Sequence, residues 1–333
     1  MLFRSMKNLL ASKDVWAQLQ IGGIMKFQGS LIFYHAGIET GLFKILEKPS
    51  TLEEVIRESN ISNTQLLSSL LDMGCALKEI SCRKGLYRLK GSMARALAAN
   101  VPLAALVSET VRYHGDVAQN LDSFLAGNTK GDYLKDFGGV IAESSRILEP
   151  IIKAFIYHTV KKKAPLTILE FGCGAGEYLK YYVDINGNNG GIALDKDTSA
   201  AAIARQKLRE NNIEANFTVA QDNIIHPETI QGKTFDVVTS FSNIYYFSDE
   251  ERLRLFRAIH ALLNRNGRFM LVTAFKTSHL SSAYYDLIFS ATEGLYPLPR
   301  VNDIVRDLKK AGFSRVKVVN LFGDYFKGVV AYR

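Results

Sequence analysis

The most constraining feature of this sequence is an apolar run that leads into a carboxylate and three alternating glycines. Residues 168–171 have the apolar character of a buried strand, and a helix-like segment follows from Tyr178. Glycine permits sharp turns and close approach of a ligand, and the start of a helix offers unpaired N–H groups. The pattern predicts a strand–bend–helix unit with a ligand at the bend. The residues of this bend are Glu170, Gly172, Cys173, Gly174 and Gly176.

A second strand-like run ends in a carboxylate about twenty residues after the bend. Residues 191–194 are followed by Asp195, nineteen residues after Gly176. An acidic residue in this position typically accepts hydrogen bonds from ribose hydroxyls. The two segments together therefore predict a site for a nucleoside cofactor.

The glycine spacing indicates which nucleoside cofactor fits. A dinucleotide-binding turn has the pattern G-x-G-x-x-G and accommodates a diphosphate on the helix N-terminus. Here the spacing is G-x-G-x-G, and Glu170 precedes Gly172 by two residues, where a carboxylate would repel phosphates. A carboxylate suits a cation instead, such as the sulfonium and amino groups of S-adenosylmethionine. The bend thus favours this methyl donor over NAD.

The C-terminal half alternates short β-rich runs with helix-length segments, which predicts a mainly parallel α/β sheet. A capping pattern at Ser248 and Glu251 predicts a helix over 249–264. The predicted strands are 166–171, 190–195, 215–219, 235–241, 267–275, 315–321 and 326–332, of which the last two form a hairpin.

The N-terminal half has a different pattern. Residues 15–47 form a broadly apolar helical segment, and two capping patterns predict short helices ending near Ser59 and Leu77. A hairpin over 77–89, with Gly85 at its turn, completes the order of a winged helix. The second short helix carries no Lys or Arg, so DNA contact is disfavoured and dimerisation is expected. The predicted domains are 1–105 (winged helix), 106–163 (helical connector contributing to the acceptor pocket) and 164–333 (cofactor binding).

Composition narrows the function further. The net charge of +8 is spread over the chain, and the densest basic run is Lys161–Lys163, so no nucleic-acid stripe is predicted. No apolar stretch approaches the ~20 residues of a membrane span, and no secretory signal is evident. The three cysteines lack metal-ligand spacing, which predicts reduced thiols in a cytoplasmic protein without disulfides or a metal site.

From about residue 160 onwards, the sequence resembles the class I S-adenosylmethionine-dependent methyltransferases. The ordered motifs are residues 170–176, Asp195, Gln221–Asn223, Phe235–Val238 and Asn266–Gly267. This resemblance implies a Rossmann-like seven-stranded sheet. It also implies that Glu170, Gly172 and Gly174 hold the methionine part, that Asp195 holds the ribose, and that Asp222 and Asn223 hold the adenine edge. Lys196, Ser240 and Phe241 are expected to line the same pocket.

The whole architecture resembles the small-molecule O-methyltransferases that dimerise through an N-terminal domain. In that family an active-site histidine normally follows the fourth strand. Tyr245 stands at the corresponding position here, and a phenol with a pKa near ~10 is a poor base. Two interpretations stay open. Either His114 or His279 serves as the base, or the acceptor is a carboxylate that needs none.

The predicted function is methyl transfer to an oxygen of a small natural-product-like molecule. The alternatives are a peptide carboxylate, an N- or C-acceptor, and a DNA-binding regulator that uses the cofactor as a ligand. A helical cap over the acceptor is expected between His279 and Leu298. Its aromatic residues are Tyr284, Tyr285, Phe289 and Tyr296.

Overall fold

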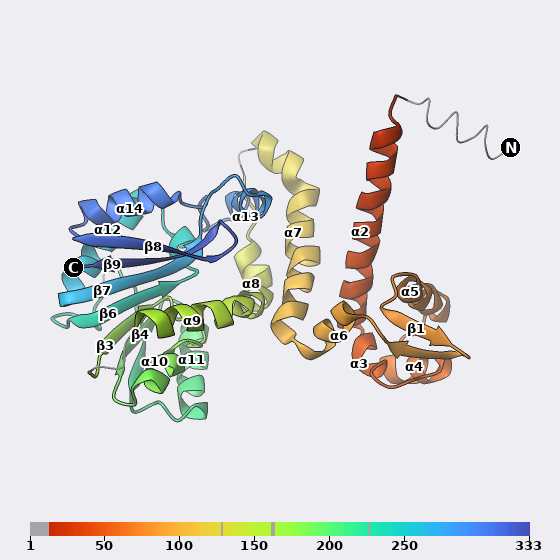
Figure 1. The fold of residues 1–333 in the computed structure, drawn as a ribbon, viewed down its shortest axis with the longest axis horizontal. Helices are drawn as coiled ribbons and strands as arrows, with labels where there is room; N and C mark the ends of the chain where they lie inside the picture. The colour runs from red at the N-terminus through yellow and green to blue at the C-terminus, as the bar shows by residue number, and fades with distance from the viewer. Residues whose placement is uncertain (1–12, 128, 161–163, 226) are drawn as a thin grey trace. The chain divides into compact units, whose positions relative to one another are not determined.

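The computed structural model describes residues 13–127, 129–160, 164–225 and 227–333 (Figure 1). The basic run Lys161–Lys163 lies outside the described residues. The chain forms two compact units, one of residues 1–118 with 139–144 and one of residues 119–138 with 145–333. The connector predicted over 106–163 is therefore divided between the two units. No helix among the described residues is long and apolar enough to cross a membrane.

The N-terminal unit is built on short amphipathic helices around one apolar core. Phe33, Leu42, Leu71 and Ile80 are fully or almost fully buried in this core. Thr51 and Glu54 form the capping box of α4, and Asn63 caps α5, each one residue after the capping pattern predicted at 50–53 and at 62–65. The elements are α2 (Val15–Glu39), α3 (Leu42–Ile45), α4 (Leu52–Ser59), α5 (Thr64–Ala76), β1 (Ile80–Arg83), β2 (Leu86–Leu89), α6 (Ser92–Ala99) and the first part of α7 (Val101–Gly127).

The predicted hairpin is present, but the cysteine prediction is wrong for two residues. Cys75 near the end of α5 and Cys82 on β1 form a disulfide, with Cα atoms 6.2 Å apart. The tight turn after α5 folds β1 back beside the end of the helix, so cysteines seven positions apart meet. Cys173 is free and buried, as expected. The cysteines therefore no longer support a cytoplasmic location, which stays a prediction.

The second unit contains the predicted seven-stranded sheet, in the order β5-β4-β3-β6-β7-β9-β8. The first five strands of this order pair in parallel, and β9 pairs antiparallel to both β7 and β8. The strands are β3 (Thr167–Phe171), β4 (Gly190–Asp195), β5 (Phe217–Gln221), β6 (Phe235–Phe241), β7 (Leu263–Ala274), β8 (Arg315–Phe322) and β9 (Phe326–Tyr332).

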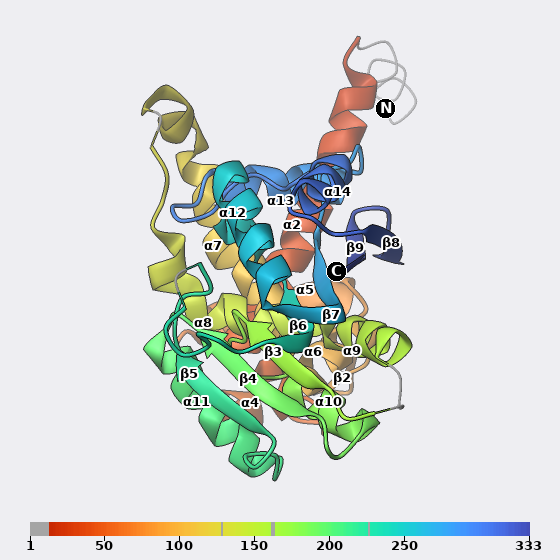
Figure 2. The same cartoon turned by 90° about the vertical axis from the view of Figure 1, so that its left-hand side faces the viewer.

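Helices cover both faces of this sheet, as Figures 1 and 2 show. One apolar cluster lies between the sheet and α9, α10 and α11, and a second lies between the sheet and α12 and α14. The helices are α8 (Tyr133–Ser145), η1 (Arg146–Leu148), α9 (Glu149–Thr159), α10 (Leu179–Ile185), α11 (Thr198–Glu210), η2 (Ile244–Tyr246), α12 (Asp249–Leu262), α13 (Leu280–Ser290) and α14 (Val301–Lys310). Because the central strands are parallel, their carboxyl ends lie at one edge of the sheet, where ligands bind in this architecture.

The predicted strand ends lie within two residues of the observed ones, including the strand predicted over 215–219 and observed as β5, except at the start of β7. The helix predicted over 249–264 ends at Leu262, since β7 already begins at Leu263. Asn266 and Gly267 therefore lie inside β7, at an irregularity in its pairing with β6, rather than before the strand. Asn266 has a φ of 113°, which a regular strand does not allow. The motif thus corresponds to a bulge.

Candidate cofactor and acceptor site

The bend after β3 has the backbone geometry that its glycines were predicted to provide. Gly172, Gly174 and Gly176 have φ values of 62°, 52° and 72°, in the left-handed region that favours glycine. A Cβ at Gly172 would meet the Asn243 side chain at 2.1 Å, whereas a Cβ at Gly174 would meet nothing within 4 Å. The first glycine is therefore required by packing, and the second leaves open space beside the backbone.

Asp195 joins the bend to the end of β4. Its Oδ2 atom accepts a hydrogen bond from the Gly174 N–H at 2.8 Å, and its Oδ1 atom accepts one from the Asp197 N–H at 3.0 Å. The Asp195 side chain is half-buried. The two predicted segments thus meet through a direct contact, and the carboxylate lies where ribose hydroxyls could reach its remaining lone pairs.

Glu170 is the buried carboxylate of the site. It is 2% exposed and accepts a hydrogen bond from the Thr239 hydroxyl at 3.3 Å. Burial raises the pKa of Glu170 to about 8, although the hydrogen bond from Thr239 lowers it. No cation of the protein forms an ion pair with Glu170 in the described part of the chain. A cationic ligand would therefore stabilise its charged form.

Cys173 lies between the two carboxylates but is not reactive. It is 6% exposed. Burial, and then the charges of Glu170 and Asp195, raise the pKa of the Cys173 thiol well above its usual value. The residue therefore contributes a protonated, packing side chain to the bend.

Ser240 and Phe241 lie beside the bend, and their side chains contact Asn243 and Tyr178. The Ser240 hydroxyl donates to Asn243 Oδ1, and Asn243 Nδ2 donates to the Phe171 carbonyl at 2.9 Å. Phe241 packs edge-on against Tyr178, with ring centroids 5.2 Å apart. Sequence reasoning missed Asn243, although a polar residue just after a strand end beside the motif is a signal that could have found it.

Asp222 and Asn223 lie next to Asp195 at the end of β5, since the Asp222 N–H donates to the Asp195 carbonyl at 3.0 Å. Asp222 Oδ2 accepts from the backbone of Glu228 and Thr229, and the Asn223 side chain accepts from Ile225. Burial raises the pKa of Asp222, but these backbone donors outweigh it and lower the pKa overall. Both side chains thus hold the loop that follows β5.

Lys196, which follows Asp195 in the chain, contacts Tyr246 of η2. The Lys196 ammonium lies 5.5 Å from the centroid of the Tyr246 ring, a cation–π contact. Burial, and then the charge of Asp195, raise the pKa of Tyr246. Tyr246 is a second residue that sequence reasoning did not assign to the site.

Tyr245 belongs to an aromatic cluster that includes Tyr246 and Phe289. The centroid of its ring lies 4.5 Å from the ring centroid of Phe289 on α13 and 5.3 Å from that of Tyr246. The Tyr245 carbonyl accepts from the Tyr296 N–H at 2.9 Å, and the Lys130 ammonium donates to the Leu295 carbonyl at 3.0 Å. The segment predicted as a cap is therefore tied to the loop after β6.

The two histidines proposed as bases differ sharply. His279 is exposed, and its Nδ1 atom accepts from the Ser281 N–H at 3.1 Å as the N-cap of α13. His114 on α7 is 4% exposed, and its Nε2 atom lies 3.4 Å from Glu109 Oε1. Glu109 also accepts from the Ser144 hydroxyl. The structure thus gives His279 a capping function and His114 a carboxylate partner within the N-terminal unit.

Comparison with known proteins tests the assignment of the cofactor site. A family model described as a methyltransferase domain matches residues 168–267, which hold both the bend and Asp195. The chain therefore contains a methyltransferase domain. A search of curated proteins finds no match.

Solved structures with low sequence identity share the fold of this methyltransferase over nearly its whole length. The mitomycin 7-O-methyltransferase MmcR has a TM-score of 0.81 at 14% identity, covering 96% of this chain and 98% of its own. PigF with S-adenosylhomocysteine has a TM-score of 0.78 at 16% identity, covering 97% and 100%. Human N-acetylserotonin methyltransferase in complex with S-adenosylmethionine has a TM-score of 0.74 at 14% identity, covering 97% and 99%.

Proposed function

We propose that this methyltransferase transfers the methyl group of S-adenosylmethionine to an oxygen of a small natural-product-like acceptor. The observation that carries the proposal is the bend of Glu170 and Gly172–Gly176, joined to Asp195 and bordered by the aromatic cluster of η2 and α13. Small-molecule O-methyltransferases among the proteins with the same fold support the choice of acceptor.

The donor site fits the residues present. S-adenosylmethionine supplies an electrophilic methyl group on a sulfonium. Glu170 offers a buried carboxylate to the positive end of this molecule, and the open space at Gly174 admits it against the backbone. Asp195 would accept from the ribose hydroxyls, and residues 222 and 223 would border the adenine. The bend therefore orients a cationic nucleoside without a phosphate-binding loop.

On the acceptor side, the aromatic rings suit a flat, partly apolar molecule. Tyr245, Phe289 and Tyr285 make a continuous series of ring contacts. Such rings bind aromatic groups through stacked or edge-on contacts. Holding the acceptor oxygen in line with the methyl group supplies most of the catalysis by proximity.

For an acceptor that must lose a proton, we assign the general base to His114. A carboxylate that orients an imidazole is the arrangement found in many acid–base catalysts, and Glu109 provides it here. His279 is the weaker candidate because its Nδ1 atom already serves as a helix cap.

The alternative is a peptide carboxylate as acceptor. It is favoured by one observation in the second unit: Tyr245 stands among aromatic rings, and His279 caps a helix, so neither is arranged as a base. A carboxylate is already ionised near neutral pH and needs only to be oriented.

The protein is proposed to act as a homodimer through its N-terminal domain. Helix α2 exposes large apolar side chains on every side, including Trp16 at 75%, Met25 at 69% and Phe27 at 70% exposure. A helix that is apolar all round is normally buried. A second copy of this chain, presenting the same helix, would cover these side chains symmetrically. Light scattering at micromolar concentration should report a dimer, and Phe27→Glu should shift it to monomer.

Mass spectrometry of products tests the acceptor class. Purified protein with S-adenosylmethionine would be incubated with a panel of phenols, alcohols, amines and carboxylate peptides. A mass gain of one methyl group on an oxygen of a small molecule is expected. Exclusive methylation of peptide carboxylates would support the alternative, and exclusive methylation of nitrogen or carbon would contradict both.

A further inference from the structure

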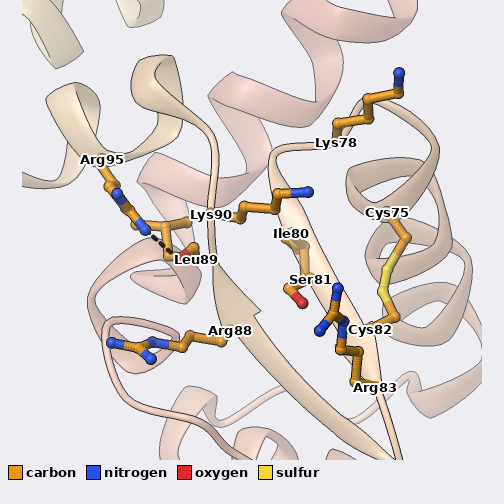
Figure 3. Close-up of a pocket in the computed structure, with 10 residues that line it drawn as sticks. All are labelled: Cys75, Lys78, Ile80, Ser81, Cys82, Arg83, Arg88, Leu89, Lys90 and Arg95. Atoms are coloured by element: carbon orange, nitrogen blue, oxygen red, sulfur yellow. Dashed lines mark hydrogen bonds between the residues drawn. A yellow bond between two sulfur atoms is a disulfide. The ribbon is translucent and has the colours of Figure 1, made fainter.

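The hairpin of the N-terminal unit carries a cationic pocket whose residues are not among those of the proposed methyl-transfer site. The pocket has a volume of about 530 Å³ (Figure 3). Its lining contains five cationic side chains and no acidic one. These cations are Lys78, Arg83, Arg88, Lys90 and Arg95.

The hairpin register explains why two of these cations, Arg83 and Arg88, lie on one face. Ser81 pairs with Arg88, and Arg83 pairs with Leu86, so these side chains lie on the face opposite Ile80 and Leu89. Ile80 and Leu89 are 2% and 3% exposed in the apolar core. The alternation of the strands therefore directs the arginines to solvent, where they border a single depression.

The only carboxylate in this segment does not neutralise them. Residues 78–95 contain six cations and one acid, Glu79. The Glu79 carboxylate accepts from the Tyr34 hydroxyl at 3.1 Å and from the Ala94 N–H at 2.9 Å. None of the five lining cations forms an ion pair with a residue that the structure describes.

Charge counts over long stretches conceal this concentration. Residues 1–110 carry a net charge of +4, but residues 78–95 alone carry +5, and the remainder of that stretch carries −1. The excess positive charge of the N-terminal half is thus located at the hairpin. The covalent link between Cys75 and Cys82 fixes β1 to the end of α5 beside the same pocket.

We propose that this pocket binds a phosphate-bearing small molecule. Guanidinium groups match the geometry of phosphate oxygens with paired donors, and several cations around a depression suit an anion of charge −2 or more. A nucleic acid fits less well, because α5, the helix that would enter a groove, carries no Lys or Arg. The ligand is therefore a compact anion rather than an extended one.

Calorimetry with inorganic pyrophosphate tests the proposal on the full-length protein. Saturating S-adenosylhomocysteine is included so that the cofactor site is occupied, and the ionic strength is held near ~0.15 M to screen diffuse charge. Saturable binding of one pyrophosphate per chain is expected. Arg88→Ala and Arg83→Ala should each weaken it by roughly tenfold or more.

The matched control is Lys84→Asn at the tip of the same hairpin. Lys84 has a φ of 50° and does not line the pocket, and asparagine tolerates this conformation. The substitution removes one positive charge and should leave pyrophosphate binding nearly unchanged. Arg88→Lys, which keeps the charge but loses the paired donors, should fall between the wild type and Arg88→Ala.

Three results would overturn the proposal. They are the absence of saturable binding, an equal loss of affinity in the control variant, and tighter binding of a short DNA duplex than of pyrophosphate. The first two would indicate diffuse surface charge, and the third a nucleic-acid surface. Binding of S-adenosylhomocysteine should be the same in all variants, which separates this site from the methyl-transfer site.

Discussion

The proposed donor site and the proposed acceptor site of this methyltransferase are built in different ways. In the proposed donor site, the backbone of the bend contacts a side chain at the end of the adjacent parallel strand, as in the hydrogen bond from the Gly174 N–H to Asp195 Oδ2. On the acceptor side, side chains from η2 and α13 pack as rings, as in the contact of Tyr245 with Phe289. The glycines of the bend form a recognisable pattern in the sequence. The aromatic residues of the cap could also be expected from the sequence, but which rings contact one another, such as those of Tyr245 and Phe289, could not.

The largest expected effect comes from disturbing the bend itself. Gly172→Ala forces a side chain into a left-handed conformation and against Asn243. We expect the affinity for S-adenosylhomocysteine to fall by roughly 100-fold, with a loss of stability of about 1–3 kcal/mol. Calorimetry and thermal unfolding measure the two effects.

Gly139→Ala in α8 is the matched control, because a Cβ at Gly139 would meet nothing within 4 Å. It should leave cofactor binding intact. Equal affinity in the Gly172→Ala and Gly139→Ala variants would mean that the bend does not hold the donor.

The second effect separates the two histidines that were considered as general bases. With a phenolic acceptor, His114→Gln should lower kcat by about 100-fold or more, as expected for loss of a general base. His279→Ala, which removes only an exposed helix cap, should change kcat little. The KM for S-adenosylmethionine should stay the same in both variants.

If His114→Gln and the wild type have a similar kcat, His114 is not the general base. The carboxylate alternative predicts that outcome, together with full activity on a peptide carboxylate.

The third effect concerns the contact between the two predicted motifs. Asp195→Asn weakens charge-assisted hydrogen bonds to ribose, so the affinity for S-adenosylhomocysteine should fall by about tenfold. Asp197→Asn is the control, since Asp197 caps α11 and asparagine is an equally good cap. If both variants bind equally well, the ribose assignment is wrong.

The last effect leaves the affinity for the cofactor aside and is a pH dependence of stability that originates at Glu170. Its pKa is about 8 in the folded protein and 4.5 in the ordinary carboxyl group, because burial disfavours the charge. Between these pH values the folded state holds a proton that the unfolded state has released. Raising the pH therefore destabilises the unliganded protein, by at most about 1.4 kcal/mol per unit.

Denaturant unfolding at several pH values measures this dependence. The stability of wild type relative to Glu170→Gln should be greatest near pH 4.5 and should fall as the pH approaches 8. A constant difference would show that Glu170 titrates as an exposed carboxyl group does.

The comparison also explains how much the sequence could predict. Strand alternation is a local property, so the strands of the sheet were predicted close to their observed positions. The glycine–carboxylate pattern is also local, and it singled out Gly174 and Asp195, which contact each other in the structure. The role of Asn243 depends on β6 lying beside β3, which joins residues 72 positions apart.

Other features were missed because they depend on which residues the fold brings together and on which face of a strand a side chain lies. The disulfide of Cys75 and Cys82 requires the turn after α5 to bring β1 back. The charge at the hairpin requires a strand register that turns Arg83 and Arg88 to one face and Glu79 toward Tyr34. Such features follow from the tertiary fold and not from local pattern.

The account depends most on the bend accepting a sulfonium nucleoside in preference to a diphosphate. Calorimetric titration of the full-length protein with S-adenosylmethionine, S-adenosylhomocysteine and NAD tests this directly. We predict saturable binding of the first two at one site per chain and none of NAD. Saturable binding of NAD that S-adenosylhomocysteine displaces, or no binding of either sulfur nucleoside, would contradict it.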